Sequence, residues 1–337
     1  MHICFMRIFK KPMKFAKLLA KSSKFHGIEL VYAHPEDVDM ETETIHGKVL
    51  VDDRWIDKEI PIPPYIDLNT YCFRYKEVIK FLNERSYISC NGSFGGKEKV
   101  YTMLKNDGEF ADLLIPSKRT STFDVFIDYL KKHEAVILKP RHGQKGRGIY
   151  KVEKGEANFY LSFENEEKKC TEEELQSILE NEIQLDKYVC QKYIDSKTKN
   201  GEPFDCRLRL EKDGKGEWTV TNYLIRIGSN QKVVANVSQG GSVCKLHSFL
   251  KANYENWQEV KDTIVEIGKT LPYKMEQLYG IRNSNMGIDL GIDSTGKPYL
   301  FEVNASPGNE FGEGEIAYIK PDFYTYILKQ LAANKVS

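Results

Sequence analysis

Two carboxylates and one carboxamide near the C-terminal end have the types and spacing needed to bind a metal ion. They lie in the segment 286–304, where apolar residues alternate with Asp289, Glu302 and Asn304. Side chains alternate between faces along a strand, so a hairpin with a two-residue loop at 295–296 sets Asp289 opposite Glu302. Carboxylate and amide oxygens are the ligands that Mg²⁺ prefers. The pattern predicts a site for one or two Mg²⁺, with Mn²⁺ as a substitute.

A hairpin that turns its polar residues toward solvent is the competing interpretation. It explains the charges but not the two glycines on the same face, Gly287 and Gly291, which we expect to leave that face open. It does not explain the polar and glycine-containing strand exit at 304–308 either. The opposite face is expected to be buried, and it comprises Met286, Ile288, Leu290, Ile292, Tyr299, Phe301 and Val303.

A basic, glycine-rich loop follows the predicted strand 135–139. It runs from Lys139 through Gly143, Gln144 and Gly146 to Gly148. Glycines let backbone N–H groups turn toward an anion, and a lysine adds a point charge, so phosphate is the natural partner. The loop is not a Walker A loop, because Gly-Lys-Ser/Thr is missing and strands follow it. A basic turn on an ordinary hairpin has a similar composition. The interpretation as a phosphate-binding loop is therefore favoured mainly because the predicted metal-binding hairpin follows in the same chain.

An arginine-bearing strand supplies a third set of candidates. Asp205, Arg207 and Arg209 alternate with apolar residues and share one face, while Arg226 ends the neighbouring strand and Asn236 precedes a Gly-Gly pair. Guanidinium groups stabilise transferring phosphoryl oxygens and bind carboxylates. A cross-strand ion-pair ladder on a wet face is the alternative, and it stays more open for Arg209 than for Arg207.

The elements that position these residues predict three units. At 337 residues the chain exceeds one typical core. We expect an α/β unit with a parallel sheet over 1–92, a second unit over 93–194 and a β-rich unit over 195–337. Predicted helices span 97–105, 122–133, 171–183 (opened by a capping box), 256–280 and 314–333. Predicted strands of the last two units include 188–194, 204–211, 218–227, 233–237, 286–292 and 299–304.

The composition excludes several classes of protein. Lys and Arg together number 49, as do Asp and Glu, so we expect no nucleic-acid partner. Lysines interrupt every apolar run near the N-terminus, so no membrane segment is expected. Seven scattered cysteines without C-x-x-C spacing indicate buried thiols in a reducing, cytoplasmic setting. The sequence allows a homodimer but does not decide the oligomeric state.

The order of these motifs resembles the ATP-grasp superfamily, specifically its YheC/YheD-like, endospore coat-associated branch. The order is a lysine helix, a lysine-Pro-glycine loop, a hinge strand, Asp-x-Arg, Asn before Gly-Gly, and Asp followed by Glu-x-Asn, over 97–308. The branch resemblance extends to the N-terminal stretch around 46–64. It implies a mixed α+β and α/β architecture. Two α+β subdomains would clasp ATP, preceded by a small Rossmann-like pre-ATP-grasp domain.

The resemblance also implies roles for individual residues. Lys99 and Lys139 would contact the ATP phosphates under the lid loop 143–148, and Arg207 would stabilise the transferred phosphoryl group. Arg226 and Asn236 would lie near it. The hinge Gln191, Lys192, Tyr193 and Ile194 would hold the adenine, and Asp289, Glu302 and Asn304 would bind Mg²⁺. This sequence has Gln191 where the superfamily often has Glu, and Asp195 is the best candidate for a ribose-binding carboxylate.

The implied activity is an ATP-dependent ligase that joins a carboxylate to an amine, or less often a thiol, through an acylphosphate. ADP and phosphate would be the other products. A nucleotide-binding coat or assembly protein with little catalysis is one alternative, and a small-molecule kinase on the same scaffold is another. The sequence identifies neither the carboxylate nor the acceptor.

Overall fold

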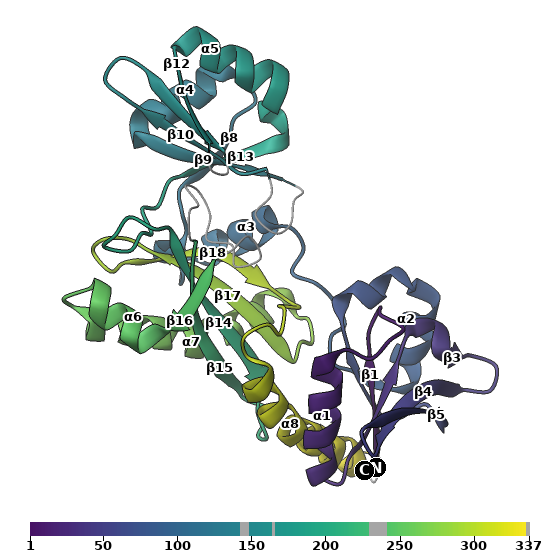
Figure 1. The fold of residues 1–337 in the computed structure, drawn as a ribbon. Helices are drawn as coiled ribbons and strands as arrows, with labels where there is room; N and C mark the ends of the chain where they lie inside the picture. Colours follow the sequence, from purple (N-terminus) through teal and green to yellow (C-terminus); the bar gives the residue numbers. More distant parts are fainter. Residues whose placement is uncertain (142–147, 164–165, 229–240, 335–337) are drawn as a thin grey trace.

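The computed structural model describes residues 1–141, 148–163, 166–228 and 241–334, which form three sheets (Figure 1). The N-terminal sheet has seven strands, in the order β3-β4-β2-β1-β6-β7 with β5 on β4. β1 is parallel to both β2 and β6, and β7 is parallel to β6, which gives the Rossmann-like core that the sequence predicts. The strands are β1 (His2–Met6), β2 (Glu29–Ala33), β3 (Val38–Asp39), β4 (Thr44–Val51), β5 (Arg54–Pro61), β6 (Tyr65–Leu68) and β7 (Tyr87–Ile88). The helices are α1 (Lys14–Phe25) and α2 (Lys76–Arg85).

The middle sheet has six antiparallel strands in the order β12-β11-β10-β9-β13-β8, and it carries α4 and α5 (Figure 1). The predicted capping box is present, because Thr171 Oγ accepts from the Glu174 N–H at 3.2 Å and the Glu174 carboxylate accepts from the Thr171 N–H at 2.9 Å. The elements are β8 (Ser117–Arg119), α4 (Phe123–His133), β9 (Ala135–Pro140), β10 (Tyr150–Lys154), β11 (Phe159–Phe163), β12 (Glu166–Cys170), α5 (Glu172–Ser177), a π-turn (Ile178–Ile183) and β13 (Tyr188–Lys192).

The C-terminal sheet has five strands in the order β16-β15-β14-β17-β18. Every residue of β17 is buried. Helices cover one face of the sheet (Figure 1), and Arg207 and Arg209 of the neighbouring strand bind Asp289 and the Pro307 carbonyl at the other. Its elements are β14 (Phe204–Lys212), β15 (Trp218–Ile227), β16 (Ser242–Lys245), α6 (Leu246–Asn253), α7 (Trp257–Tyr279), β17 (Asn285–Ile292) and β18 (Pro298–Asn304). The sequence did not predict α6 and β16. The predicted strand 233–237 lies outside the described residues.

Two helices pack away from the units in which the sequence places them. α3 (Lys97–Asp107) contributes Val100 and Leu104 to the core of the C-terminal sheet. α8 (Glu313–Ala333) runs from the C-terminal sheet to the N-terminal unit, where it lies beside α1 and shares its core (Figure 1). The expected units 93–194 and 195–337 therefore do not each form one core.

A buried ionic network joins the N-terminal unit to the C-terminal sheet. Lys320 of α8 donates to Asp67 at 2.8 Å and lies 3.1 Å from Glu211. Arg7 and Arg209 extend the chain of alternating charges, since Arg7 binds Asp67 at 2.9 Å and Arg209 binds Glu211 at 2.5 Å. Each of the five side chains is buried. Removing one member would leave its partner charged and buried, which is costly.

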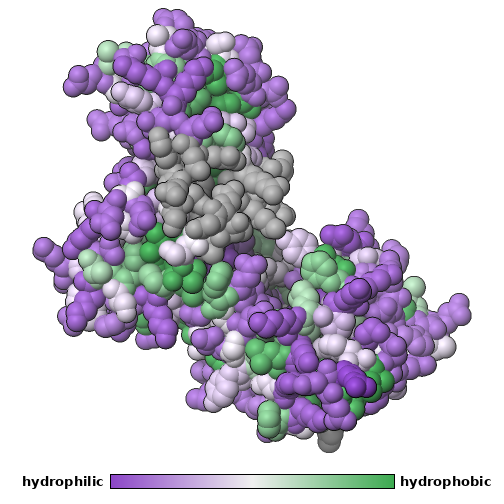
Figure 2. Space-filling view, in the orientation of Figure 1, coloured by the Kyte–Doolittle hydropathy of each residue, from purple (hydrophilic) through white to green (hydrophobic). Residues whose placement is uncertain are grey.

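Hydrophilic residues cover most of the described surface on the face shown in Figure 2. Apolar residues appear on that face in small groups. Among the helices in the described parts of the chain, none is both long enough and apolar enough to cross a bilayer.

Candidate functional site

The hairpin β17–β18 sets Asp289 opposite Glu302, as predicted, and it also sets Gly287 opposite Asn304. The loop differs from the prediction. The Asp293 N–H donates to the Lys297 carbonyl at 3.0 Å, so the loop comprises residues 294–296, with Gly296 at φ 89°. A β-bulge beside Asp289 then shifts the pairing by one residue. The two differences cancel at Asp289 and Glu302.

The bulge changes which residues of β18 face the core. Leu300 and Val303 are each 7% exposed and belong to the core cluster. Tyr299 and Phe301 are only partly buried and lie outside that cluster. The expectation that Tyr299 and Phe301 share the buried face is therefore wrong. Phe301 is the extra residue at the bulge, so the strand residues before it face the opposite way from the alternation that the sequence predicts.

The two glycines of β17 make room for side chains. A Cβ on Gly291 would lie 2.1 Å from Phe301 Cζ, and a Cβ on Gly287 would lie 2.7 Å from Pro307 Cβ. The expectation that these glycines leave an open face is wrong. They let the Phe301 ring and Pro307 pack closely over the strand.

An arginine ladder occupies the face beside Asp289. Arg207 binds Asp289 through two hydrogen bonds, of 2.6 and 2.5 Å. Arg226 binds Asp205 through two bonds of 2.6 Å and lies 3.3 Å from Asp289. Asp205 is 7% exposed and Asp289 is 4% exposed, so the ladder is buried rather than on a wet face.

The two carboxylates of the ladder differ in pKa. Burial acts to raise the pKa of Asp289, but Arg207 and Arg226 outweigh it and hold the pKa below its ordinary value. Burial raises the pKa of Asp205 to about 6. Arg226 acts to lower this pKa, and the negative charge of the neighbouring Asp289 acts to raise it further. Asp289 is therefore ionised at neutral pH. Both its oxygens already bind arginine, so a metal ion at Asp289 would have to share these oxygens with Arg207.

Two lysines from different units lie near Glu302. Lys97 Nζ lies 3.5 Å from Glu302 Oε2. Lys139 Nζ lies 5.3 Å from the centre of the Phe301 ring, and no carboxylate lies within ion-pair distance of it in the part of the chain that the structure describes. Burial lowers the pKa of Lys139 to about 8, with a further contribution from Lys97 and an opposing one from Glu302. A partly buried ammonium with no partner anion among the described residues suits a bound polyphosphate.

Lys99 lies elsewhere. Its side chain is exposed, and its Nζ lies 5.2 Å from the centre of the Tyr279 ring. Positions two apart on an α-helix point about 200° away from each other, so only one of Lys97 and Lys99 can face β18. The structure brings Lys97 to the cluster and not Lys99. The helix had to be placed against β18 before the two could be distinguished.

The hinge leaves one backbone acceptor without a strand partner. The Lys192 N–H donates to the Pro116 carbonyl at 2.9 Å, and β13 and β8 are antiparallel there. In an antiparallel ladder, two residues paired in this way normally exchange two hydrogen bonds. The second bond would run from the N–H of residue 116 to the Lys192 carbonyl, but a proline has no N–H to donate. The sequence pattern does not single out Pro116, because the role of this proline depends on the register between β13 and β8.

The side chains of the hinge face different surroundings. Gln191 Nε2 donates to Ser117 Oγ at 3.0 Å, while its Oε1 is buried without a partner in the described chain. The Tyr193 hydroxyl donates to Asp195 at 3.2 Å, and Ile194 is 7% exposed. The peptide edge and the apolar Ile194 suit a flat heterocycle, and Gln191 offers no charge.

The oxygen donors beside Lys97 fit a cation only in part. Glu302 is 33% exposed and Asn304 is half-buried opposite Gly287, so both oxygens are accessible. In the described residues, no group of three or more His, Cys, Asp or Glu side chains could hold a metal. Glu302 and Asn304 thus form an incomplete donor set, which phosphate oxygens and Asp289 could complete.

The remaining predicted site residues lie in the lid loop and before the Gly-Gly pair. Gly148 has φ 72°, a backbone conformation that favours glycine, and it packs against Pro140. Gly143, Gln144, Gly146 and Asn236 lie outside the described residues.

The three-sheet arrangement, with the lysines and the carboxylate hairpin between the middle and C-terminal sheets, defines an ATP-grasp fold. D-alanyl-alanine synthetase A from Vibrio cholerae O1 biovar eltor str. N16961 has the same fold, with a TM-score of 0.53 and 12% identity over 100% of this chain and 98% of that one.

The chain belongs to the YheC/D like ATP-grasp family, whose sequence profile matches residues 87–329. It is 24% identical to the endospore coat-associated protein YheD of Bacillus subtilis (strain 168), over 90% of this chain and 69% of YheD. It is 23% identical to YheC of the same organism, over 87% of this chain and 84% of YheC.

Proposed function

We propose that this protein is an ATP-dependent carboxylate–amine ligase that works through an acylphosphate. The observation that carries the proposal is that Lys97 and Lys139 both lie near Glu302, next to the pair formed by Arg207 and Asp289. These groups come from three parts of the chain, and among the described residues no carboxylate lies within ion-pair distance of the partly buried Lys139 ammonium. Polyphosphate is the ligand class that such a set accommodates best.

ATP would lie along this surface with its adenine at the hinge. The Lys192 carbonyl would accept from the adenine amino group, and the peptide N–H of Ile194 would lie on the same edge. Lys97 and Lys139 would bind the phosphates. Glu302 and Asn304 would hold Mg²⁺, which supplies neutralisation of the phosphate charge when bound.

The chain's own residues would position the reactants and neutralise charge. An oxygen of the substrate carboxylate attacks the γ-phosphorus, ADP leaves, and an acylphosphate forms. The amine nitrogen then attacks the acyl carbon, phosphate leaves, and the amide remains after a proton is lost. Arg207 would move one N–H from Asp289 to the transferred phosphoryl group, while Arg226 stays on Asp205 and keeps Asp289 paired.

The decisive experiment follows oxygen atoms. A panel of carboxylates labelled with ¹⁸O is incubated with the protein, Mg-ATP and amines, and the phosphate released is analysed for the label. An acylphosphate intermediate transfers one ¹⁸O to phosphate. The Glu302→Ala variant should lose this turnover, with Glu310→Ala as the control because Glu310 lies beyond the hairpin. Full turnover by Glu302→Ala would show that the metal assignment is wrong.

A second candidate function is a nucleotide-binding protein with little catalysis that associates with the spore coat. It is favoured by the coat-associated relatives and by Asp289, whose two oxygens are both bound by arginine. It predicts ATP binding without any label in phosphate. A stable phosphorylated product in place of an amide would instead indicate a kinase.

A further inference from the structure

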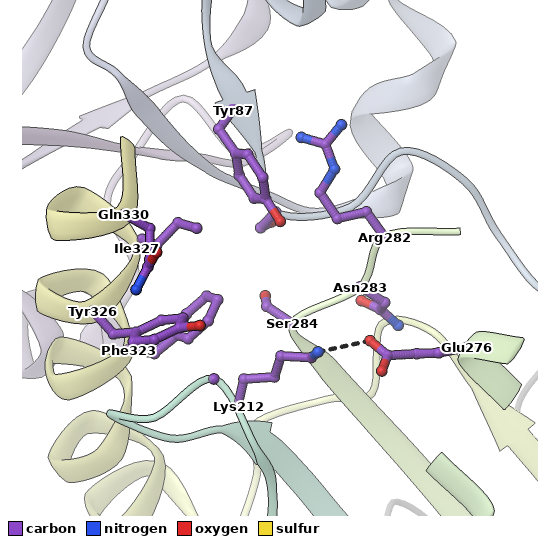
Figure 3. A pocket seen from close by; sticks show the side chains of 12 residues that line it. Tyr87, Lys212, Glu276, Arg282, Asn283, Ser284, Phe323, Tyr326, Ile327 and Gln330 are labelled. Carbon is purple, nitrogen blue, oxygen red and sulfur yellow. Dashed lines mark ion pairs between the residues drawn. The ribbon is translucent and has the colours of Figure 1, made fainter. Parts of the chain in front are cut away.

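A cavity of about 350 Å³ lies between the N-terminal unit, α8 and the end of the C-terminal sheet that is remote from the arginine ladder (Figure 3). Its volume is in the range of small-molecule sites. Its walls come from several elements: Tyr87 from β7, Lys212 from the end of β14, Arg282 and Ser284 from the segment before β17, and Phe323 and Ile327 from α8.

This cavity is separate from the proposed ATP site. Lys212 lies five residues beyond Arg207 on β14, and Ser284 lies five residues before Asp289. Five residues of a strand span about 16 Å. A ligand here is therefore too far from Asp289 to take part in phosphoryl transfer.

A buried hydroxyl, that of Ser284, lies on the cavity wall. Ser284 is 3% exposed, and its side chain points into the open space in Figure 3. The Ser284 and Tyr65 hydroxyls interact with each other, but in the described chain neither meets the geometric criteria of a hydrogen bond. Buried polar groups are nearly always hydrogen-bonded, so the Ser284 hydroxyl is suited to donate to a molecule bound in the cavity.

The charges on the wall have both signs. The Arg282 guanidinium carbon lies 4.0 Å from the centre of the Tyr87 ring, and Arg282 has no carboxylate partner among the described residues. Lys212 and Glu276 form an ion pair of 2.8 Å, with side chains 19% and 26% exposed. A free guanidinium and a carboxylate thus lie across the cavity from an apolar wall.

The apolar wall belongs to α8. Phe323 and Ile327 are one turn apart on that helix, and they are 5% and 6% exposed. In Figure 3 they lie opposite Arg282 and Ser284. A ligand with a charged end and an apolar end would match both sides.

We infer that this cavity binds a free α-amino acid with an apolar side chain. Its carboxylate would bind Arg282 and accept from the Ser284 hydroxyl, its ammonium would bind Glu276, and its side chain would pack on Phe323 and Ile327. The inference does not depend on the proposed function.

Occupancy of this site would stiffen the joint between two units. Two of the lining residues lie at this joint. Lys212 follows Glu211, and Lys320 pairs both with Glu211 and with Asp67 of the N-terminal unit. Tyr87 also belongs to the N-terminal unit. A ligand that touches Tyr87, Arg282 and α8 favours the arrangement in which these walls meet. The site is thus placed to influence how the N-terminal unit packs against α8 and the C-terminal sheet.

Binding to the full-length protein can be measured by calorimetry with L-phenylalanine and L-leucine as probes. 3-Phenylpropionate lacks the ammonium and 2-phenylethylamine lacks the carboxylate, so each should bind at least about tenfold more weakly than phenylalanine. Absence of binding by both amino acids, or binding of either analogue as tightly as phenylalanine, overturns the inference.

Variants locate the site. Arg282→Met keeps the contact with Tyr87 but loses the charge, and it should weaken phenylalanine binding about tenfold. Arg85→Met is the matched control, because Arg85 stacks on Phe81 at 3.8 Å and does not line the cavity. Lys139→Met should leave phenylalanine binding intact. Unchanged binding by Arg282→Met, or its loss in Lys139→Met, contradicts the assignment, and thermal unfolding of each variant checks its fold.

Discussion

Lys97 and Glu302 meet across 205 positions of the chain, with Nζ 3.5 Å from Oε2, because α3 packs on β18. The contact places the first lysine of α3 beside the carboxylate hairpin. Lys99, two positions later, instead lies over Tyr279. The two lysines thus form a natural pair for testing which of them binds a nucleotide.

Lys97→Met should weaken ATP binding by one to two orders of magnitude, since it removes a charge-assisted contact worth roughly 1.5–3 kcal/mol. Lys99→Met, made on the same helix, should change the affinity less than about twofold. Fluorescent-nucleotide titration of the two variants measures both constants. The reverse ranking would restore Lys99 to the site and remove Lys97 from it.

The hairpin shows how far a sequence pattern reaches. Alternation along β17 and β18 correctly predicted that Asp289 faces Glu302. It could not predict the three-residue loop or the compensating bulge, because one inserted residue moves every later side chain to the other face. The errors at Tyr299 and Phe301 have the same cause.

Other features depended on tertiary contacts that no local pattern contains. The sequence predicts the helices α3 and α8 to within about two residues at each end, but it does not predict which cores they pack into. The bidentate contact of Arg207 with Asp289 needed the pairing of β14 with β17, since the two residues are far apart in sequence. Composition gave no reason to prefer Lys97 or to notice Pro116.

ATP affinity should fall as the pH rises above about 8 in the free protein. Burial lowers the pKa of Lys139 to about 8, so its ammonium loses its proton in that range. Only the charged form attracts phosphate, and bound phosphate raises the pKa again, so binding takes up a proton at alkaline pH. Calorimetry in buffers of different ionisation enthalpy measures that uptake. In Lys139→Met the uptake should disappear, and an unchanged pH profile would place the titrating group elsewhere.

Pro116→Ala should weaken ATP binding severalfold. Alanine supplies an N–H opposite the Lys192 carbonyl, where proline has none, and a strand bond of about 1 kcal/mol would then compete with the adenine amino group. The affinity for GTP, which offers a carbonyl at that position, should change less. Pro63→Ala, in the N-terminal unit, is the control. Equal losses for both nucleotides would indicate a general distortion of the hinge.

Arg207→Met should abolish turnover more strongly than it affects ATP binding. The variant removes the group that would move to the transferred phosphoryl, and it leaves Asp289 with Arg226 alone. A loss of one donor to a developing charge costs about 10²–10³ in kcat. Arg207→Lys keeps the charge but not the paired bonds, so it should recover only part of the rate. Single-turnover assays separate kcat from binding, and equal effects on both would make Arg207 a binding residue only.

Asp67→Asn should destabilise the protein by about 3 kcal/mol or more, because Lys320 and Arg7 would lose a buried anion. Burial opposes ionisation of Asp67, yet Lys320 and then Arg7 hold its pKa far below the ordinary value of 3.8. A lowered pKa means that the stabilisation is complete above pH 3.8 and is lost as the pH falls below it. The difference in the free energy of unfolding between wild type and variant should therefore be constant from about pH 5 to 7 and shrink in stronger acid.

Asp53→Asn is the matched control, because Asp53 is 59% exposed beside Lys21 and its loss should cost less than about 0.5 kcal/mol. Denaturant unfolding at several pH values measures both, and equal, small losses would show that the network does not hold the two units together.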